Sequence, residues 1–345
     1  MTAGSLTDRI ASAVASFRED QTAVAAGAAL VTKSGAVAVA VDGVTAKGDT
    51  DRVAPEDAWH IGSCTKAVTA LTIATLVEDR MIDWNAPIAN MFTDIEGVDQ
   101  AWTQLSVADL LHCRAGIRAN IPISDMSGAH DSTATDVNQR TDLAKTILSA
   151  PTEPGRFVYS NVSYILAGAL IDRVAGTPYE LAVAERVMKP LGVTDFGFGA
   201  PPRIAGHRRT VQVGPFGVGR LIPKRPEERA SDNPALYSPA GRLHLPLAQW
   251  AKFVSLFLGS PEPLVGAESI QRLLEPPAGE HFAMGWGRHP HGGSFMQGSN
   301  TLSGATVRMQ NGYGALVVVS DAREKVLRAS ATFADQLLSV LASGP

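Results

Sequence analysis

The chain has 345 residues, of which 45% are hydrophobic and 19% charged, and its formal net charge is -4 at pH 7. This composition is typical of a globular protein with a large core, and the slight acidity argues against nucleic acid or an anionic membrane as a partner. No apolar run reaches the ~20 residues that a membrane-spanning helix needs.

The N-terminal region lacks the pattern of an export signal. Glu19 and Asp20 precede the apolar run over 23–31, where a signal peptide carries positive charge. We therefore expect a cytoplasmic protein, or a periplasmic one if a leader has been removed. The two cysteines, Cys64 and Cys113, do not suggest a disulfide framework, and we expect Cys64 to be a small buried residue.

The first part of the chain alternates between strand and helix patterns. Apolar spacing predicts a helix over 7–17, strands over 26–32 and 36–44 joined by a turn at 33–35, a short apolar segment over 59–61, a helix over 66–79 and an extended segment over 82–88.

The middle of the chain is predicted to be helical with long loops. A short helix over 106–111 has Ser106 as its N-cap and Asp109 at its third position. The polar stretch over 120–138 and the Gly- and Pro-rich stretch over 197–240 are expected to be loops. Between and after them, the periodicity predicts helices over 142–149, 161–174, 179–188 and 247–258.

The end of the chain returns to strand patterns. Strands are predicted over 283–288, 294–297, 304–310 and 315–320, with a tight turn at Asn311-Gly312 and a closing helix over 324–341. The fold class is therefore α+β, with an antiparallel sheet built from both termini, flanked by helices, and an all-helical insert region between them. We expect an α/β region over 1–85 and 241–345, and a helical, loop-rich region over 86–240.

A possible nucleophile lies at the start of the helix over 66–79. Ser63 and Lys66 are three residues apart, which places both side chains on one helix face. A serine hydroxyl is a poor nucleophile until a base takes its proton, and a lysine can do so if burial lowers its pKa from the usual ~10.4. Such a short pattern also arises by chance, so its context must decide.

Two later segments supply that context. Tyr159-Ser160-Asn161 precedes the predicted helix over 161–174, and Gly298-Ser299-Asn300-Thr301 lies at the break between two late strands. Tyr159 alone could be an ordinary half-buried aromatic residue. The order and spacing of the three segments favour one catalytic site.

Together these residues resemble the serine β-lactamase and penicillin-binding-protein superfamily, and in particular its class C-like branch, which includes family VIII carboxylesterases and D-stereospecific peptidases. The resemblance extends over most of the chain, roughly residues 10–341. It is strongest at His-Ile-Gly-Ser-Cys-Thr-Lys over 60–66, Leu-Ser-Val-Ala-Asp-Leu-Leu-His-Cys-Arg-Ala-Gly over 105–116, the Tyr-Ser-Asn segment and Pro-Leu-Gly-Val over 190–193.

The resemblance implies a role for each residue. Ser63 would be the acylated nucleophile, Lys66 its proton acceptor or the group that keeps a partner deprotonated, and Tyr159 the proton carrier to the leaving group and the activator of water. Asn161 would hold Lys66 and the acyl side chain. The backbone N–H groups of Ser63 and Ser299 would form the oxyanion hole, and which group is the acylation base stays open.

The third motif departs from the family pattern. The family usually has Lys-Thr-Gly or His-x-Gly, whereas this chain has Met296-Gln297-Gly298. A thioether cannot hold a carboxylate or stabilise a tyrosinate, so Met296 favours a neutral ester or amide substrate. His289, His291 or Arg308 could supply the missing charge, but we expect these three to be surface residues.

Other motifs are better explained by structure. Ser231-Asp232-Asn233 matches a class A motif but reads as a turn, and Lys33-Ser34-Gly35 precedes the nucleophile and reads as a hairpin turn. The basic cluster of His207, Arg208, Arg209, Arg220, Lys224 and Arg225 is expected to be solvated surface. His289-x-His291 lacks further ligands, so we expect neither a metal nor a cofactor.

The sequence therefore predicts a serine hydrolase, with a carboxylesterase acting on small or medium acyl esters as the preferred activity. The alternatives are a β-lactamase, DD-peptidase, or D-amino-acid amidase or aminopeptidase, and a binding protein that keeps the fold without turnover. The expected partner is a small-molecule ester or amide, and the sequence leaves the oligomeric state unknown.

Overall fold

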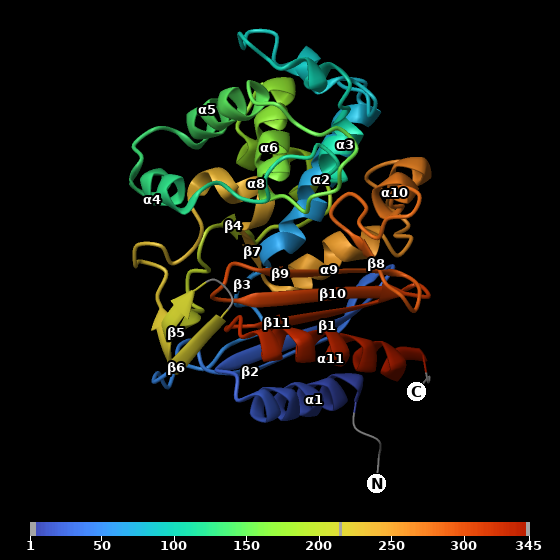
Figure 1. Ribbon diagram of the computed structural model, residues 1–345. Coiled ribbons are helices and arrows are strands. Elements are labelled where there is room, and N and C mark those ends of the chain that lie inside the picture. The colour runs from blue at the N-terminus through green and yellow to red at the C-terminus, as the bar shows by residue number, and fades with distance from the viewer. Residues whose placement is uncertain (1–4, 214–215, 343–345) are drawn as a thin grey trace.

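The computed structural model describes residues 5–213 and 216–342, and its lower half is a six-stranded antiparallel sheet (Figure 1). The strand order is β2-β1-β11-β10-β9-β8. Their bounds are β1 Ala25–Thr32, β2 Gly35–Gly43, β8 Gly287–Arg288, β9 Ser294–Ser299, β10 Gly304–Gln310 and β11 Tyr313–Val319.

The sheet joins the two ends of the chain. β1 pairs with β11, with Ala28 opposite Val317, and with β2 on its other edge. The turn at Lys33-Ser34 closes the β1–β2 hairpin, and Asn311-Gly312 closes the β10–β11 hairpin, as the sequence predicts. The expected sheet built from both termini is therefore confirmed.

Two helices cover one face of this sheet. α1 (Leu6–Gln21) and α11 (Glu324–Ala342) lie side by side beneath it (Figure 1), and the rings of Phe17 and Phe333 stack with centroids 4.6 Å apart. Alternate residues of β1 point to opposite faces, so Ala26, Ala28 and Leu30 pack toward these helices. Because both faces are covered, nearly every residue of β1 is buried.

The other face carries the helical region. α9 (Leu247–Leu256) packs against β1 and β2, whereas α2 rises from the sheet into the helical region, where α6, α7, α8 and α10 pack around it (Figure 1). Ser106 and Asp109 form the expected capping box at the start of α3. The bounds of the helices in this region are α2 Thr65–Glu78, α3 Val107–Leu111, α4 Ile123–Asp131, α5 Asp136–Leu148, α6 Asn161–Ala175, α7 Tyr179–Val183, α8 Ser238–Gly241 and α10 Ala267–Leu274.

Buried charges join three of these helices. Arg140 of α5 is fully buried and donates to both carboxylate oxygens of Asp172 on α6, at 2.8 and 2.9 Å. It also reaches the carboxylate of Glu180 on α7 at 3.1 Å. The bidentate geometry compensates for the removal of both charges from water.

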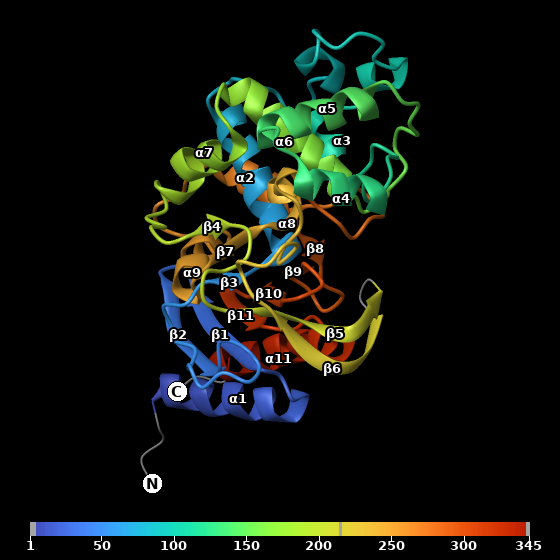
Figure 2. The same ribbon diagram turned by 90° about the vertical axis from the view of Figure 1, so that its left-hand side faces the viewer.

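The insert region is not all helical, and two predicted loops are wrong. Residues 123–131 form α4, and α5 begins at Asp136, within the stretch expected to be irregular. The Gly- and Pro-rich stretch contains β4 (Gly197–Phe198) and a hairpin of β5 (Gly206–Val213) and β6 (Phe216–Lys224), which stands beside the main sheet (Figure 2). Its strands satisfy their backbone groups by pairing with each other.

Smaller corrections concern the ends of elements. The segment over 82–88 forms no strand and makes a single bridge from Pro87 to Ser106. The strand predicted over 283–288 shrinks to β8, because Gly285 adopts a positive φ of +82° that interrupts it. The helix α10 was not predicted.

A second, three-stranded sheet lies between the main sheet and the helical region. β3 (Trp59–His60) pairs with β7 (Leu243–Leu245), which also pairs with β4. None of the helices within the described residues is both long and apolar enough to cross a membrane.

Candidate active site

The site begins where β3 leads into α2. A single turn, Gly62–Cys64, joins them, and Gly62 adopts a φ of +52° that favours glycine. The Thr65 hydroxyl donates to the Gly62 carbonyl at 2.7 Å and accepts the Leu243 N–H at 3.2 Å. This turn places Ser63 at the N-terminal end of α2, where backbone N–H groups are unpaired. Cys64 is buried, as expected.

Lys66 lies inside the protein beside Ser63. Its Nζ is 3.1 Å from Ser63 Oγ, 2.6 Å from Asn161 Oδ1 and 2.7 Å from the Ala240 carbonyl oxygen. The side chain is fully buried, and it makes no ion pair within residues 5–213 and 216–342. Burial lowers the pKa of Lys66 to about 7, because the charged form loses its hydration. A large fraction of the amine is therefore neutral near neutral pH.

Tyr159, two residues before the start of α6, lies beside Lys66 and Ser63. The Lys66 Nζ is 5.1 Å from the centroid of its ring, and the hydroxyl shares a hydrogen bond with Ser63. The residue as a whole is 38% exposed, although its hydroxyl is hydrogen-bonded to Ser63. Burial raises the pKa of Tyr159, and the hydrogen bond with Ser63 opposes this only in part. The phenol is therefore neutral near pH 7.

Asn161 links Lys66 to the helical region. Its Oδ1 accepts from Lys66, and its Nδ2 donates to Asn120 Oδ1 at 2.6 Å. The sequence did not indicate Asn120 or the Ala240 carbonyl, since neither belongs to a motif that reasoning from spacing can detect. The structure brings Ser63, Lys66, Tyr159 and Asn161 together within one cluster.

The end of β9, with Gly298 and Ser299, lies against the turn Gly62–Cys64, which we call the nucleophile turn. A Cβ atom at Gly298 would lie 2.2 Å from the Ile61 oxygen and 2.6 Å from the Ser63 nitrogen. A Cβ atom at Gly62 would lie 2.3 Å from the Ser299 nitrogen. The two backbones thus touch, with the N–H groups of Ser63 and Ser299 next to each other. Only glycine permits such an approach at both positions.

A cavity of about 670 Å³ opens at Ser63. Its wall is largely apolar: Phe157, Tyr159 and Phe282 form an aromatic group, with Tyr159 and Phe282 in edge-to-face contact at 5.3 Å. Met296 is 6% exposed and contributes to the same wall. The sequence did not single out the two phenylalanines, because an aromatic residue in a loop or strand carries no signature of a pocket.

His289, His291 and Arg308 could supply the cation that is missing at Met296, but none of the three lines this cavity. Arg308 is only 2% exposed, so its prediction as a surface residue is wrong. It binds Asp335 at 2.8 Å and several backbone carbonyl groups instead. Among the described residues, no group of three or more His, Cys, Asp or Glu side chains is placed to hold a metal ion.

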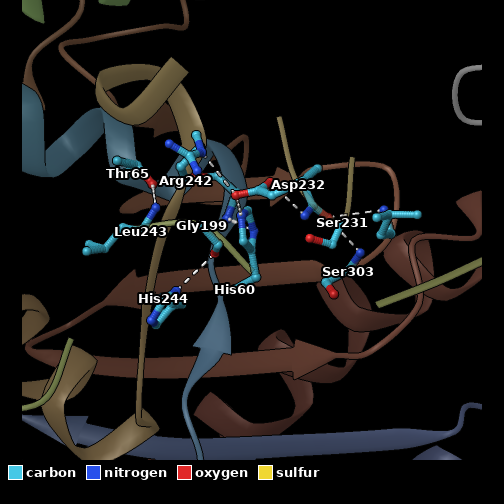
Figure 3. A network of polar contacts seen from close by, with 12 residues as sticks. His60, Thr65, Gly199, Ser231, Asp232, Arg242, Leu243, His244 and Ser303 are labelled. Atoms are coloured by element: carbon cyan, nitrogen blue, oxygen red, sulfur yellow. Dashed lines mark hydrogen bonds and ion pairs between the residues drawn. The ribbon is translucent and has the colours of Figure 1, made fainter. Parts of the chain in front are cut away.

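Two other predictions about polar segments need revision. Asp232, in the segment read as a simple turn, is buried and contacts His60, Asn300 and Arg242 (Figure 3). His207, expected on the surface, is 2% exposed and binds the Lys47 N–H and the Ser320 carbonyl. Arg225 of the same cluster is exposed and pairs with Asp49.

Comparison with known proteins shows the family to which the chain belongs. Residues 10–335 match the Beta-lactamase family. The D-amino acid amidase from Ochrobactrum anthropi SV3 superposes with a TM-score of 0.77 at 20% identity, over 97% of this chain and 99% of that one. A class C beta-lactamase from Rhodobacter sphaeroides gives a TM-score of 0.72 at 18% identity, over 97% and 99%.

Curated sequence relatives match over shorter stretches. An unguisins hydrolase of Aspergillus campestris is 26% identical over 148 residues, which are 41% of this chain and 27% of that protein. The matched region therefore spans about a quarter of that relative's length. Because the family match covers nearly the whole chain, the chain belongs to the beta-lactamase family, whose members are serine hydrolases.

Proposed function

We propose that the chain is a carboxylesterase that acts on small or medium acyl esters through an acyl-enzyme on Ser63. The observation that carries this proposal is the fully buried Lys66 amine, 3.1 Å from Ser63 Oγ and with a pKa of about 7. A base with a pKa near the working pH is the one best suited to accept a proton from a nucleophile.

The contacts of Lys66 suit a neutral amine. Two of its neighbours, Asn161 Oδ1 and the Ala240 carbonyl oxygen, can only accept hydrogen bonds, and a neutral amine has two N–H groups to give them. Its lone pair then faces the Ser63 hydroxyl. Because burial raises the pKa of Tyr159, its phenolate is scarce at neutral pH, and Lys66 is the acylation base in this proposal.

Acylation follows from this arrangement. Ser63 Oγ attacks the ester carbonyl carbon while its proton passes to Lys66 Nζ, and the oxyanion receives hydrogen bonds from the N–H groups of Ser63 and Ser299. The neutral Tyr159 phenol can donate its proton to the departing alcohol and take one back from the lysine side. Release of the alcohol leaves an ester bond on Ser63, and a water activated by the same groups hydrolyses it.

The cavity favours an uncharged, apolar acyl group. Phe157, Phe282 and Met296 line it. In the family that the sequence resembles, the third motif usually has a Lys or His at the position of Met296, and a thioether cannot bind a carboxylate as those residues can. Glu280 also lines the cavity, but it is paired with Arg114 at 2.5 Å. An ester with an apolar acyl chain would bury its surface there without leaving a charge unpaired.

The test is hydrolysis of short p-nitrophenyl esters. Ser63→Ala should lower kcat by at least 1,000-fold, because the covalent route is lost. Ser231→Ala is the matched control and should retain activity. A fluorophosphonate should label the wild type on Ser63 in peptide mapping. Equal esterase rates in wild type and Ser63→Ala would contradict the proposal.

The structural similarity to a D-amino acid amidase supports a second candidate, hydrolysis of amides or β-lactams. Met296→His separates the two. If the apolar wall belongs to the natural pocket, this change should lower kcat/KM for apolar esters about tenfold without creating nitrocefin turnover. Rapid nitrocefin turnover by the wild type would favour the β-lactam hypothesis. A ligand that binds without any acyl-enzyme would favour a binding protein.

A further inference from the structure

One buried carboxylate, Asp232, contacts three segments near the nucleophile. Its side chain is 4% exposed. Oδ2 lies 3.0 Å from His60 Nε2 and 3.4 Å from Arg242 Nε, and Oδ1 accepts from Asn300 Nδ2 at 2.9 Å (Figure 3). Burial alone would raise the pKa of Asp232, but these neighbours outweigh it and hold the pKa below its ordinary value. The group is therefore ionised.

The first contact leads to the nucleophile turn. The Gly62 N–H donates to His60 Nδ1 at 3.0 Å, so this ring nitrogen is an acceptor and carries no proton. The ring proton must then sit on Nε2, where it is donated to Asp232. The His60 side chain is completely buried, and its ring connects the carboxylate to the residue immediately before Ser63.

The second contact leads to β9. Asn300 follows Ser299 and is 6% exposed. Its Oδ1 accepts the N–H groups of Leu302 at 3.1 Å and Ser303 at 2.8 Å, which closes the turn between β9 and β10. Its Nδ2 donates to Asp232. The same carboxylate therefore holds the residue after Ser299.

We propose that Asp232 is a positioning residue, which fixes the spacing of the Ser63 and Ser299 N–H groups through His60 and Asn300. The inference rests on the proposed function, in which these N–H groups receive the oxyanion. An oxyanion hole is effective because its donors are fixed before charge develops. Asp232 does not line the cavity at Ser63, and its contacts go to His60, Asn300 and Arg242, so it acts on the rate through its hydrogen-bonded neighbours.

The polarity of the hydrogen bonds allows a sharp test. In Asp232→Asn, an NH2 group replaces one carboxylate oxygen, so the donor of the new amide faces the Nδ2 donor of Asn300 and their hydrogen bond is lost. In Asn300→Asp, two carboxylates face each other. In the double variant Asp232→Asn/Asn300→Asp, the amide at position 232 donates to the carboxylate at position 300, and the acceptors for His60, Leu302 and Ser303 are kept.

Each single variant should lower kcat for a p-nitrophenyl ester about 10- to 100-fold with KM changed less than threefold. This is below the ~10²–10³-fold loss expected from deleting an oxyanion donor outright. The double variant should recover kcat to within about fivefold of wild type. All values are expressed per active site, counted by complete fluorophosphonate labelling, so protein that fails to fold does not enter the rate.

The matched control is Asp321→Asn. Asp321 is also a buried, ion-paired carboxylate, held by Arg323 at 2.8 and 3.0 Å, but its hydrogen bonds run to Arg323 and not to His60 or Asn300. Its loss should lower the melting temperature without changing kcat per labelled site. Single variants with wild-type kcat, or a double variant as slow as the singles, would overturn the proposal. A wild type that neither labels nor hydrolyses esters would instead refute the proposed function.

Discussion

At the scale of single residues, the chemistry of the site depends on where charge is removed from water. Lys66 has no carboxylate partner among the described residues, so nothing compensates for its burial except polar, uncharged oxygens. This differs from Arg140, whose two carboxylates keep it charged and raise its pKa. Burial without a counter-charge thus lowers the pKa of Lys66, whereas burial beside two carboxylates leaves Arg140 in a structural ion pair.

The pH dependence of activity follows from this difference. Because only the neutral Lys66 amine accepts a proton, kcat/KM should rise with pH through an apparent pKa of about 7. Below that value the loss should be about tenfold per pH unit. The measurement is kcat/KM for a p-nitrophenyl ester between pH 5 and 9. A profile that is flat through pH 7, or that falls as pH rises, would exclude Lys66 as the base.

The sequence could indicate Ser63, Lys66, Tyr159 and Asn161 because each lies in a short motif. It could not indicate Asn120 or Ala240, because their contacts join segments 41 and 174 residues apart in the chain. The burial of Arg308 was missed for a related reason. A charged side chain on a strand becomes buried only if a distant partner, here Asp335, compensates for its lost hydration.

At the scale of elements, the apolar helices and strands of the core were predictable, and elements with few or no buried residues were not. α4 has no buried residue, and its Ile123 is 87% exposed, so it lacks the apolar stripe that marks a helix in sequence. The β5–β6 hairpin likewise leaves Val211 and Val218 exposed. α2 and α6 are buried along most of their length, and they and the strands β1, β2, β9, β10 and β11 were predicted within a few residues of their ends.

The contact between β9 and the nucleophile turn gives a prediction at this scale. Gly298→Ala would place a methyl group 2.2 Å from the Ile61 oxygen, with backbone on both sides. The strand must shift, so kcat should fall more than 100-fold because the Ser299 N–H moves with it. Steady-state kinetics and a thermal melt measure both effects.

Gly128→Ala is the matched control for that substitution. Gly128 lies inside α4, and a Cβ atom there would have no neighbour within 4 Å. Alanine should therefore leave the activity unchanged and stabilise the protein by about 0.5–1 kcal/mol. An active, undisturbed Gly298→Ala protein would show that the two backbones are not in close contact.

At the scale of the whole molecule, the sheet separates two apolar clusters. One lies between the sheet and the pair α1 and α11, and the larger one lies between the sheet and the helical region. The candidate active site is at the edge of the larger cluster, where β9 meets the turn Gly62–Cys64 that precedes α2. Cohesion of the helical region therefore bears on both stability and catalysis.

Arg140 tests that cohesion. Arg140→Met leaves the buried Asp172 carboxylate without its bidentate partner, and the free energy of unfolding should fall by about 3–5 kcal/mol. Urea denaturation followed by circular dichroism measures this. Arg229→Met removes a bidentate pair of similar geometry with Asp131 on the surface and should leave the unfolding free energy unchanged within error. Equal effects of the two changes would contradict the structural role of Arg140.

The pairing of β1 with β11 also constrains the order of events during synthesis. β1 is translated long before β11, so one of its edges stays without a partner until residues 313–319 have emerged from the ribosome. Ser299, which lies against the turn Gly62–Cys64, is likewise translated well after Ser63. A nascent chain can therefore assemble the helices between these two residues first, and Ser63 and Ser299 come together only after β9 has emerged.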